Sequence, residues 1–447
     1  MRCAIVLLLC LLSNAVVGQG FFTLKDNKVQ TFSFELINNV VVVPVKINGV
    51  PLSFLLDTGV KETILFGNNQ DSVDLENVYK VRFSGLGIEE GIEGLLALSN
   101  TIEVGESLID TNHNLYVVLS DQLDLSAHLG VEINGIIGSK FFRDHLIEMD
   151  YVKKHIRIYP KEYVIPENKL KKYEEIRITL ERDRPYFQTS ILLNKEWVEA
   201  KLLVDMGNTD ALMLFPFTFE DFEVAKPNVD DYIGKGFSGE IFGKRNRIDS
   251  YKIGKFTLRH PVVSYPDSSA VQFAKLAEGR KGSIGNQTLL RFNILIDYQK
   301  NRLLIRKNKY FGKPFYFNIS GIDVKHDGLV WEKTFINMQT QRERRDPNNS
   351  FNTVITFDTD KFNYQFSLKP NYVVSGIRKN SPAEIAGVKV GDTLLKINGK
   401  HVRDLNLLEI NSRLQKPSNH DMNLLLLRNG EQLRVSFRLI DPIPFKE

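Results

Sequence analysis

The amino-acid sequence predicts a mainly β protein built from two similar lobes, followed by a third domain of a different kind. Three observations lead to this prediction. Short segments rich in β-branched and aromatic residues, separated by Asn, Gly and Asp, are dense before Arg306. Several of these segments recur at one spacing, which indicates a duplication. After Arg306 the pattern of the sequence changes.

The composition is that of an ordinary globular protein. The chain has 447 residues, of which 43% are hydrophobic and 25% are charged, so two or three domains are expected. The net charge of +4 is small for this length, and no basic stripe with interleaved aromatic residues points to nucleic acid as a partner. The eight His are scattered without a close pair or a Cys partner, so we expect neither a metal site nor a cofactor.

Residues 1–18 have the pattern of a secretory signal peptide, with one basic residue, a short apolar core, and then small and polar residues. Cleavage is expected after Gly18, with cleavage after Ala15 as the alternative. A lipidated Cys10 is disfavoured because Leu9 stands where a lipoprotein signal needs a small residue. No later segment approaches about 20 uninterrupted apolar residues, so no other part of the chain is expected to span a membrane.

The repeat is clearest around two acidic residues. The stretch LLVDMGNTDALMLF contains Asp205, and the similar stretch FLLDTGVKETILF contains Asp57, 148 residues earlier. Taken alone, either Asp-containing stretch reads as a turn between two strands. Further landmarks recur in the same order at offsets of 147 to 149 residues: Gly138 with Gly285, Asp150 with Asp297, Gly105 with Gly254, and the segment Gly85–Gly94 with Gly234–Gly243. We therefore expect lobes at residues 19–165 and 166–312, and a third domain with an inserted loop at residues 313–447.

Two Asp residues in two copies of one turn suggest a specific chemistry. An apolar strand delivers each carboxyl to the interior, and the Gly two residues later permits a tight turn. Burying two carboxylates side by side is costly unless they share a proton. A pair that shares one proton can act as base and acid, so that water attacks a peptide carbonyl.

These motifs resemble those of aspartic proteases of the retropepsin-like and pepsin-like fold. The matching stretches are LLDTGV, GIIGSKFF and IEMDY in the first half and LLVDMG, GSIGNQ and LIDYQ in the second, across about residues 31–306. The resemblance implies a bilobal fold in which Asp57 and Asp205 are the catalytic pair. It places Gly138 and Gly285 in ψ-shaped loops beneath the two Asp residues.

The resemblance assigns support of the two active-site loops to four further residues: Thr58, Gly59, Met206 and Gly207. In the family, a Thr or Ser follows each catalytic Asp and braces the two loops across the pseudo-two-fold axis. Thr58 keeps this hydroxyl, whereas Met206 cannot donate a hydrogen bond. Asn208 or Thr209 is a candidate replacement, and without one we expect a looser second loop and reduced activity.

The resemblance also implies a flap, a glycine-rich hairpin that folds over the substrate. Two segments at equivalent positions are the candidates, and their glycines are Gly85, Gly87 and Gly94 in the first and Gly234, Gly236 and Gly243 in the second. The alternative is that both segments are ordinary hairpins. The first contains no Tyr, so a flap tyrosine of the pepsin kind is not expected there.

The last third of the chain resembles a PDZ domain of the type attached to bacterial secreted proteases. The resemblance rests on YVVSGIRKNSPAEIAGVKVGDTLLKINGKHVRDL, which runs from Tyr372 to Leu405. Such a domain binds a peptide by adding it as a strand to a sheet edge, with backbone amides receiving a terminal carboxylate. The candidate loop for this carboxylate consists of Ile319, Ser320, Gly321 and Ile322. A plain strand is the alternative at these positions.

Together these patterns predict an exported aspartic endopeptidase that acts on peptide or protein substrates, with a PDZ domain that can take a C-terminal peptide ligand. Export to a periplasm or to the outside of the cell follows from the signal-peptide pattern. A bacterial source is suggested by the pairing of the two domains. The alternative is a catalytically impaired peptide-binding protein on the same scaffold, and Met206 is the residue that supports it.

Overall fold

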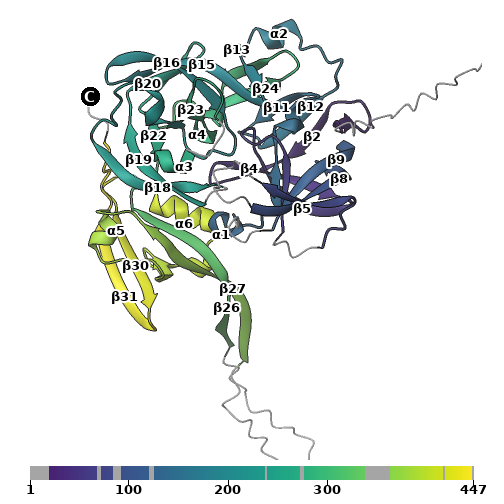
Figure 1. Cartoon of the computed structure of the whole chain (residues 1–447). Helices are drawn as coiled ribbons and strands as arrows, with labels where there is room; N and C mark the ends of the chain where they lie inside the picture. Colours follow the sequence, from purple (N-terminus) through teal and green to yellow (C-terminus); the bar gives the residue numbers. More distant parts are fainter. Residues whose placement is uncertain are drawn as a thin grey trace, which may run out of the picture. The chain divides into compact units, whose positions relative to one another are not determined.

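The structure is a computed structural model that describes residues 20–67, 72–83, 92–119, 125–236, 239–271, 276–337, 363–415 and 418–444. These residues form two units (Figure 1). The first unit takes the described parts of Met1–Asp124, Ile133–Phe315 and Ile443–Glu447, and the second takes Leu125–Glu132 and the described parts of Tyr316–Pro442. No helix among the described residues is long and apolar enough to cross a membrane.

The first half of the first unit folds into a nine-stranded sheet. Strand β4 reads VVVVPVKI and buries most of its side chains, as expected for a β-branched run inside a sheet. The strand order is β1-β9-β6-β10-β5-β4-β8-β7, with β3 paired to β4. The bounds are β1 Thr23–Leu24, β3 Glu35–Ile37, β4 Val40–Ile47, β5 Val50–Leu56, β6 Thr63–Phe66, β7 Val78–Phe83, β8 Ile92–Val104, β9 Leu108–Val118 and β10 Gly135–Ile137.

The second half of the first unit repeats this architecture in a ten-stranded sheet. Strand β16 pairs in parallel with β23, just as β5 pairs in parallel with β10. The order is β18-β19-β22-β17-β23-β16-β15-β20-β21, with β14 paired to β15. The bounds are β14 Thr179–Glu181, β15 Arg184–Leu193, β16 Glu196–Val204, β17 Leu212–Leu214, β18 Asn228–Gly236, β19 Gly239–Arg247, β20 Ser250–Ile253, β21 Phe256–Arg259, β22 Val262–Pro266 and β23 Arg280–Ile284.

A third sheet of six strands joins the two lobes, with three strands from each half of the repeat. At its centre β11 and β24 pair antiparallel, with Ile147 opposite Ile296 and Asp150 opposite Asn293. The repeated stretches IEMD and ILID thus face each other across this sheet. The order is β13-β25-β24-β11-β12-β2, with bounds β2 Gln30–Ser33, β11 Leu146–Asp150, β12 His155–Tyr159, β13 Glu174–Arg177, β24 Phe292–Asp297 and β25 Arg302–Lys307. The predicted mainly β fold with two similar lobes is therefore confirmed.

Helices in the first unit are single turns that connect strands. The most important for the site are η2 and α4, which begin directly after Gly138 and Gly285 and so occupy equivalent positions in the two lobes. The bounds are η2 Ser139–Phe142, α2 Glu167–Leu170, η3 Pro216–Thr218, α3 Ser268–Val271 and α4 Asn286–Leu289.

The second unit is a six-stranded sheet with a helix packed on it. The order is β26-β27-β28-β30-β31, with β29 paired to β28, so β26 is an edge strand of the described sheet. A segment from much earlier in the chain, which contains the single-turn helix α1, also belongs to this unit. The bounds are α1 Ser126–Leu129, β26 Ile322–Asn337, β27 Asn363–Ile377, α5 Pro382–Ile385, β28 Thr393–Ile397, β29 Lys400–His401, η4 Val402–Asp404, α6 Leu407–Leu414, β30 Asp421–Arg428 and β31 Glu431–Arg438.

Helix α6 begins at a complete capping box. The Asn406 side chain accepts a hydrogen bond from the Glu409 amide at 2.9 Å, and the Glu409 carboxylate accepts one from the Asn406 amide at 3.0 Å. Leu407, Ile410 and Leu414 follow at helical spacing and are buried. The cap and this apolar face together hold a helix of only eight residues.

Replacing Asn406 by Ala is expected to destabilise α6 by about 1 kcal/mol, because one amide at the start of the helix loses its acceptor. The amides of α6 should then exchange with solvent deuterium about fivefold faster, which hydrogen exchange can measure locally in the full chain. Asn406→Asp keeps an acceptor and is the control. Equal exchange in the Ala and Asp variants would show that the cap does not stabilise the helix.

Candidate active site

Asp57 directly follows β5, at the point where this buried strand ends. Its amide donates a hydrogen bond to the Ile137 carbonyl of β10 at 3.0 Å. Gly138 comes next in the chain, and a Cβ there would collide with the carbonyl oxygens of Lys61 and Glu62. The glycine is therefore what lets the later strand pass close beneath the Asp57 turn.

Asp205 lies at the equivalent position after β16. Its amide donates to the Ile284 carbonyl of β23, also at 3.0 Å. A Cβ at Gly285 would collide with the carbonyl oxygens of Asn208 and Asp210. Both lobes thus present an Asp on a turn that a parallel strand and a glycine hold from below.

The structure brings the two carboxyls together through the glycines that follow them. Asp57 Oδ1 accepts hydrogen bonds from the Gly59 amide at 2.6 Å and the Gly207 amide at 3.1 Å. The Gly207 amide also lies 3.2 Å from Asp205 Oδ1. A Cβ at Gly59 would lie 2.7 Å from Asp205 Oδ1, and one at Gly207 would collide with the Asp57 carboxyl. Each turn therefore needs a glycine where the opposite acid approaches.

The pair favours a bound proton. Burial and then the charge of Asp205 raise the pKa of Asp57 from 3.8 to about 7, although the Gly59 and Gly207 amides and the Arg184 charge oppose this. Burial also raises the pKa of Asp205, against the charge of Arg280, the amides of its own turn, and a hydrogen bond from Asp57. One proton shared by two adjacent carboxyls near neutral pH is the state that this arrangement favours.

Thr58 braces the second turn from the first. Its hydroxyl donates to the Val204 carbonyl at 2.6 Å and accepts from the Met206 amide at 3.0 Å. Thr58 is buried, so these two bonds cross the lobe boundary without competition from solvent. The Met206 side chain is also buried and has no hydroxyl to return the same brace.

A different group supports the Met206 loop. Asn286, the first residue of α4, donates its side-chain amide to the Met206 carbonyl at 2.5 Å. The Tyr151 hydroxyl, from the other lobe, donates to Asn286 Oδ1 at 3.0 Å. Asn208 also helps within its own lobe through a hydrogen bond to Ser283 at 3.1 Å. Sequence reasoning proposed Asn208 or Thr209 and missed Asn286 and Tyr151.

The symmetric positions in the other lobe lack this bridge. Ser139 stands where Asn286 stands, and Tyr298 stands where Tyr151 stands, each 147 residues away. The hydroxyls of Ser139 and Tyr298 are both buried and have no hydrogen-bond partner in the structure. The second lobe, whose loop has Met206 in place of a Thr, thus has the longer Asn286 side chain at the position where the first lobe has Ser139. The signal was in the sequence, because Asn286 and Tyr151 each directly follow a repeated motif.

The flap candidates are only partly described. Gly85 and Gly87 lie outside the described residues, and Gly94 lies in β8, which pairs with β7. Gly234 and Gly236 lie in β18 and Gly243 in β19, and these two strands form an antiparallel hairpin. Their role as flaps stays a prediction.

In the second unit, three residues of the candidate carboxylate loop come directly before the edge strand β26, and the fourth, Ile322, is the first residue of that strand. Ile319, Ser320 and Ile322 are buried, and Gly321 has a φ of +75°. The Arg378 guanidinium donates to the Asn318 carbonyl at 2.7 Å and the Ile319 carbonyl at 3.0 Å. The loop is therefore fixed from its carbonyl side, and its role in binding stays a prediction.

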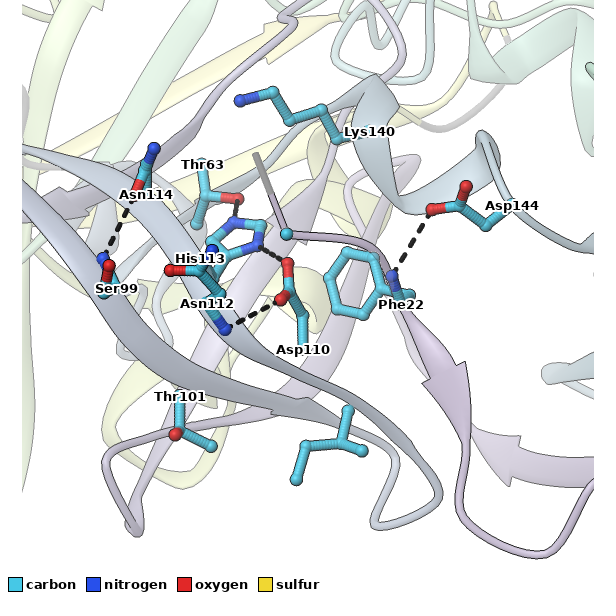
Figure 2. A network of polar contacts seen from close by, with 12 residues as sticks. Phe22, Thr63, Ser99, Thr101, Asp110, Asn112, His113, Asn114, Lys140 and Asp144 are labelled. Atoms are coloured by element: carbon cyan, nitrogen blue, oxygen red, sulfur yellow. Dashed lines mark hydrogen bonds and ion pairs between the residues drawn. The ribbon is translucent and has the colours of Figure 1, made fainter. Parts of the chain in front are cut away.

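A second polar cluster resembles a catalytic triad but is closed to substrate (Figure 2). His113 Nε2 lies 2.7 Å from the Thr63 hydroxyl, and His113 Nδ1 lies 2.8 Å from Asp110 Oδ2. All three side chains are at most 3% exposed, and the Phe22 ring packs 5.4 Å from the His113 ring. We interpret the cluster as a satisfied polar group inside the first sheet. Within the described ranges, no three His, Cys, Asp or Glu side chains are grouped so that they could hold a metal ion.

Replacing Asp57 by Asn is expected to stabilise the protein at pH 7, by on the order of 2–4 kcal/mol, and to change little near pH 3. The folded protein holds a proton on Asp57 up to about pH 7, whereas the unfolded chain releases it near 3.8. The wild type therefore loses stability as pH rises through this window, and Asn does not titrate. Urea unfolding at both pH values measures the difference, and an equal effect at both would contradict the raised pKa.

The Asn286 bridge gives a second expectation. Asn286→Ser should lower the free energy of unfolding by about 2 kcal/mol, because it leaves the Tyr151 hydroxyl and the Met206 carbonyl without their partner. Ser139→Ala is the matched control at the symmetric position, where the hydroxyl makes no hydrogen bond in the structure and its loss should cost little. Urea unfolding of both variants tests the bridge, and similar effects at the two positions would count against it.

Two protein families and one solved structure are similar to parts of this chain. The profile of the Aspartyl protease family matches residues 43–141, and that of the PDZ domain family matches residues 373–428. Among solved structures, the chain is similar to the aspartic proteinase from Irpex lacteus, with 15% identity and a TM-score of 0.41, over 64% of this chain and 99% of that one. The described residues thus form two similar β lobes, the first of which matches the Aspartyl protease family over residues 43–141, followed by a unit that matches the PDZ domain family over residues 373–428.

Proposed function

We propose that the protein is an aspartic endopeptidase in which Asp57 and Asp205 activate water. The observation that supports this most directly is the pair itself: two carboxyls on equivalent turns, bridged by the Gly207 amide, with the pKa of Asp57 raised to about 7. A site of this kind holds one proton at the pH where it works. No metal or cofactor takes part in the proposed reaction.

The reaction follows from the shared proton. The ionised carboxylate, which we assign to Asp205, takes a proton from water while the water oxygen bonds to the carbonyl carbon of the substrate. Asp57 donates its proton to the carbonyl oxygen, which gives a tetrahedral intermediate with two hydroxyl groups. When the C–N bond breaks, the leaving nitrogen takes a proton from Asp205, and a hydroxyl proton of the intermediate returns to Asp57.

A catalytically impaired peptide-binding protein is the second candidate, and Met206 favours it. The loop that bears Asp205 lacks the hydroxyl that Thr58 supplies to the other loop. The Asn286 bridge supports the endopeptidase instead, because it holds the Met206 carbonyl by a different route. The two candidates differ in a measurable way, since only one requires both carboxyls for peptide-bond hydrolysis.

We further propose that the protein is exported and that its PDZ domain binds peptides. Export rests on the signal-peptide pattern of residues 1–18, which lie outside the described residues. Cys3 and Cys10 both fall in that segment, so the exported chain would contain no cysteine. Peptide binding rests on the PDZ match and on the edge position of β26.

Asp57→Asn and Asp205→Asn are each expected to lower the rate of cleavage of an unfolded protein at acidic pH by about a thousandfold, because each removes one half of the acid–base pair. The measurement is the release of new amino termini over time. Asp150→Asn is the matched control. Asp150 is also one of a duplicated pair at the end of a strand, and its carboxylate accepts hydrogen bonds from the Val152 and Lys153 amides of its own turn.

Cleavage that survives both Asn substitutions would contradict the endopeptidase assignment. Absence of cleavage by the wild type across a broad peptide library, together with saturable binding of peptides from that library, would establish the second candidate. Equal losses in the Asp150 control and in the two pair variants would show that the substitutions act through folding.

A further inference from the structure

The edge strand and the helix of the second unit form the place where a PDZ domain receives a peptide by strand addition. β26 is at the edge of the described sheet, and α6 packs against it. The apolar face of α6, with Leu407, Ile410 and Leu414, is buried. A peptide that joined β26 would therefore run between this strand and α6.

A segment of the same chain already lies there. Residues Leu125–Glu132 belong to the second unit, although they come from the first half of the sequence. Their helix α1 packs against β26. Gly130, which follows α1, lies against α6, because a Cβ at this position would be 2.6 Å from Leu407 Cβ. Figure 1 shows α1 beside α6.

The segment has a definite shape that suits this place. The Leu129 amide donates to the Leu125 carbonyl at 3.0 Å, and the Gly130 amide donates to the Ser126 carbonyl at 2.7 Å, which closes one helical turn. Gly130 then reverses the chain with a φ of +72°. The turn covers the strand without extending the sheet, since β26 pairs only with β27 among the described residues.

The segment is also close in sequence to the Asp57 turn. Two residues after Glu132, Asn134 exchanges two hydrogen bonds with Ser53 of β5, at 2.7 and 2.8 Å. Strand β10 follows, and its Ile137 carbonyl accepts the bond from the Asp57 amide. Only two residues therefore separate the segment that contacts β26 and α6 from the strand beneath the candidate active site.

We propose that Leu125–Glu132 is an internal ligand of the PDZ groove, and that other peptides bind this groove only by displacing it. The partner chemistry follows from the occupant: a short, mostly apolar internal segment with no terminal carboxylate. This inference deepens the proposed function, since displacement would free the chain that leads into β10. Its binding part stands apart from catalysis and can be tested without it.

The test uses the full chain with Asp57→Asn, so that no probe is cleaved. The probe is a fluorescein-labelled peptide of sequence LSAHLGVE, which copies Leu125–Glu132. In the parent protein the tethered segment competes at an effective concentration on the order of millimolar. Gly130→Ala places a Cβ against Leu407 and should displace the segment, so that fluorescence polarisation reports at least tenfold tighter probe binding.

The matched control is Gly49→Ala in a hairpin of the first sheet. Gly49 also has a positive φ, +90°, but a Cβ there meets nothing within 4 Å. Gly49→Ala introduces backbone strain at a positive φ, as Gly130→Ala does, but it causes no steric collision. This control variant should therefore bind the probe as the parent does. Equal probe affinity in the parent and in Gly130→Ala, or no saturable binding to a folded Gly130→Ala protein, would overturn the proposal.

A second variant covers the case that the Ala substitution disturbs folding. It replaces residues 125–132 by a Gly/Ser sequence of the same length, which keeps the chain connected but removes the side chains of the segment that packs against β26. The labelled probe should bind this variant at least tenfold more tightly than it binds the parent. Equal binding to the two proteins would refute the internal ligand, whatever the outcome of the cleavage assays.

Discussion

The first unit is organised around one constraint: two acidic side chains must be held within reach of one proton. Two carboxylates without other partners in this position would repel each other and lose their hydrating water. The fold therefore has to supply hydrogen-bond donors and exclude bulk water. It does so with backbone amides and with the charges of Arg184 and Arg280. The amides of Gly59 and Gly207 point at the acids, and the amides of the two Asp residues are tied to parallel strands below. The duplicated architecture follows, because one half can present only one acid.

The two lobes satisfy this constraint by unequal means. In one direction a hydroxyl at Thr58 crosses the boundary, and in the other an amide at Asn286 takes its place with a tyrosine from the opposite lobe. The compensation is local, because the group that is absent from one loop is replaced from the helix that begins beside it. A duplicated protein can therefore lose exact symmetry at its most sensitive point and still keep both loops fixed.

The sequence predicted the fold through its repeat, because equivalent strands and glycines recur at nearly one spacing and therefore indicate two similar lobes. It also singled out Asp57, Asp205, Thr58, Gly138 and Gly285, which the structure brings close together. Their roles in a reaction stay predictions. The Asn286 bridge was missed although Asn286 and Tyr151 each directly follow a repeated motif, since a hydrogen bond between distant residues leaves no periodicity that would pair the two positions. The sequence also did not indicate that Leu125–Glu132 belongs to the second unit. A single helical turn contains too few residues for its sequence pattern to indicate which element it packs against.

The central pair of strands in the six-stranded sheet has a consequence for synthesis. β11 pairs with β24, whose residues are about 147 positions later in the chain. At typical rates of translation, β11 must wait roughly seven to thirty seconds for this partner to leave the ribosome. During that time the nascent chain carries an open, apolar sheet edge of the kind that recruits other strands. The pairing of β11 with β24, which connects the finished lobes, is thus the part of the molecule most in need of protection during synthesis.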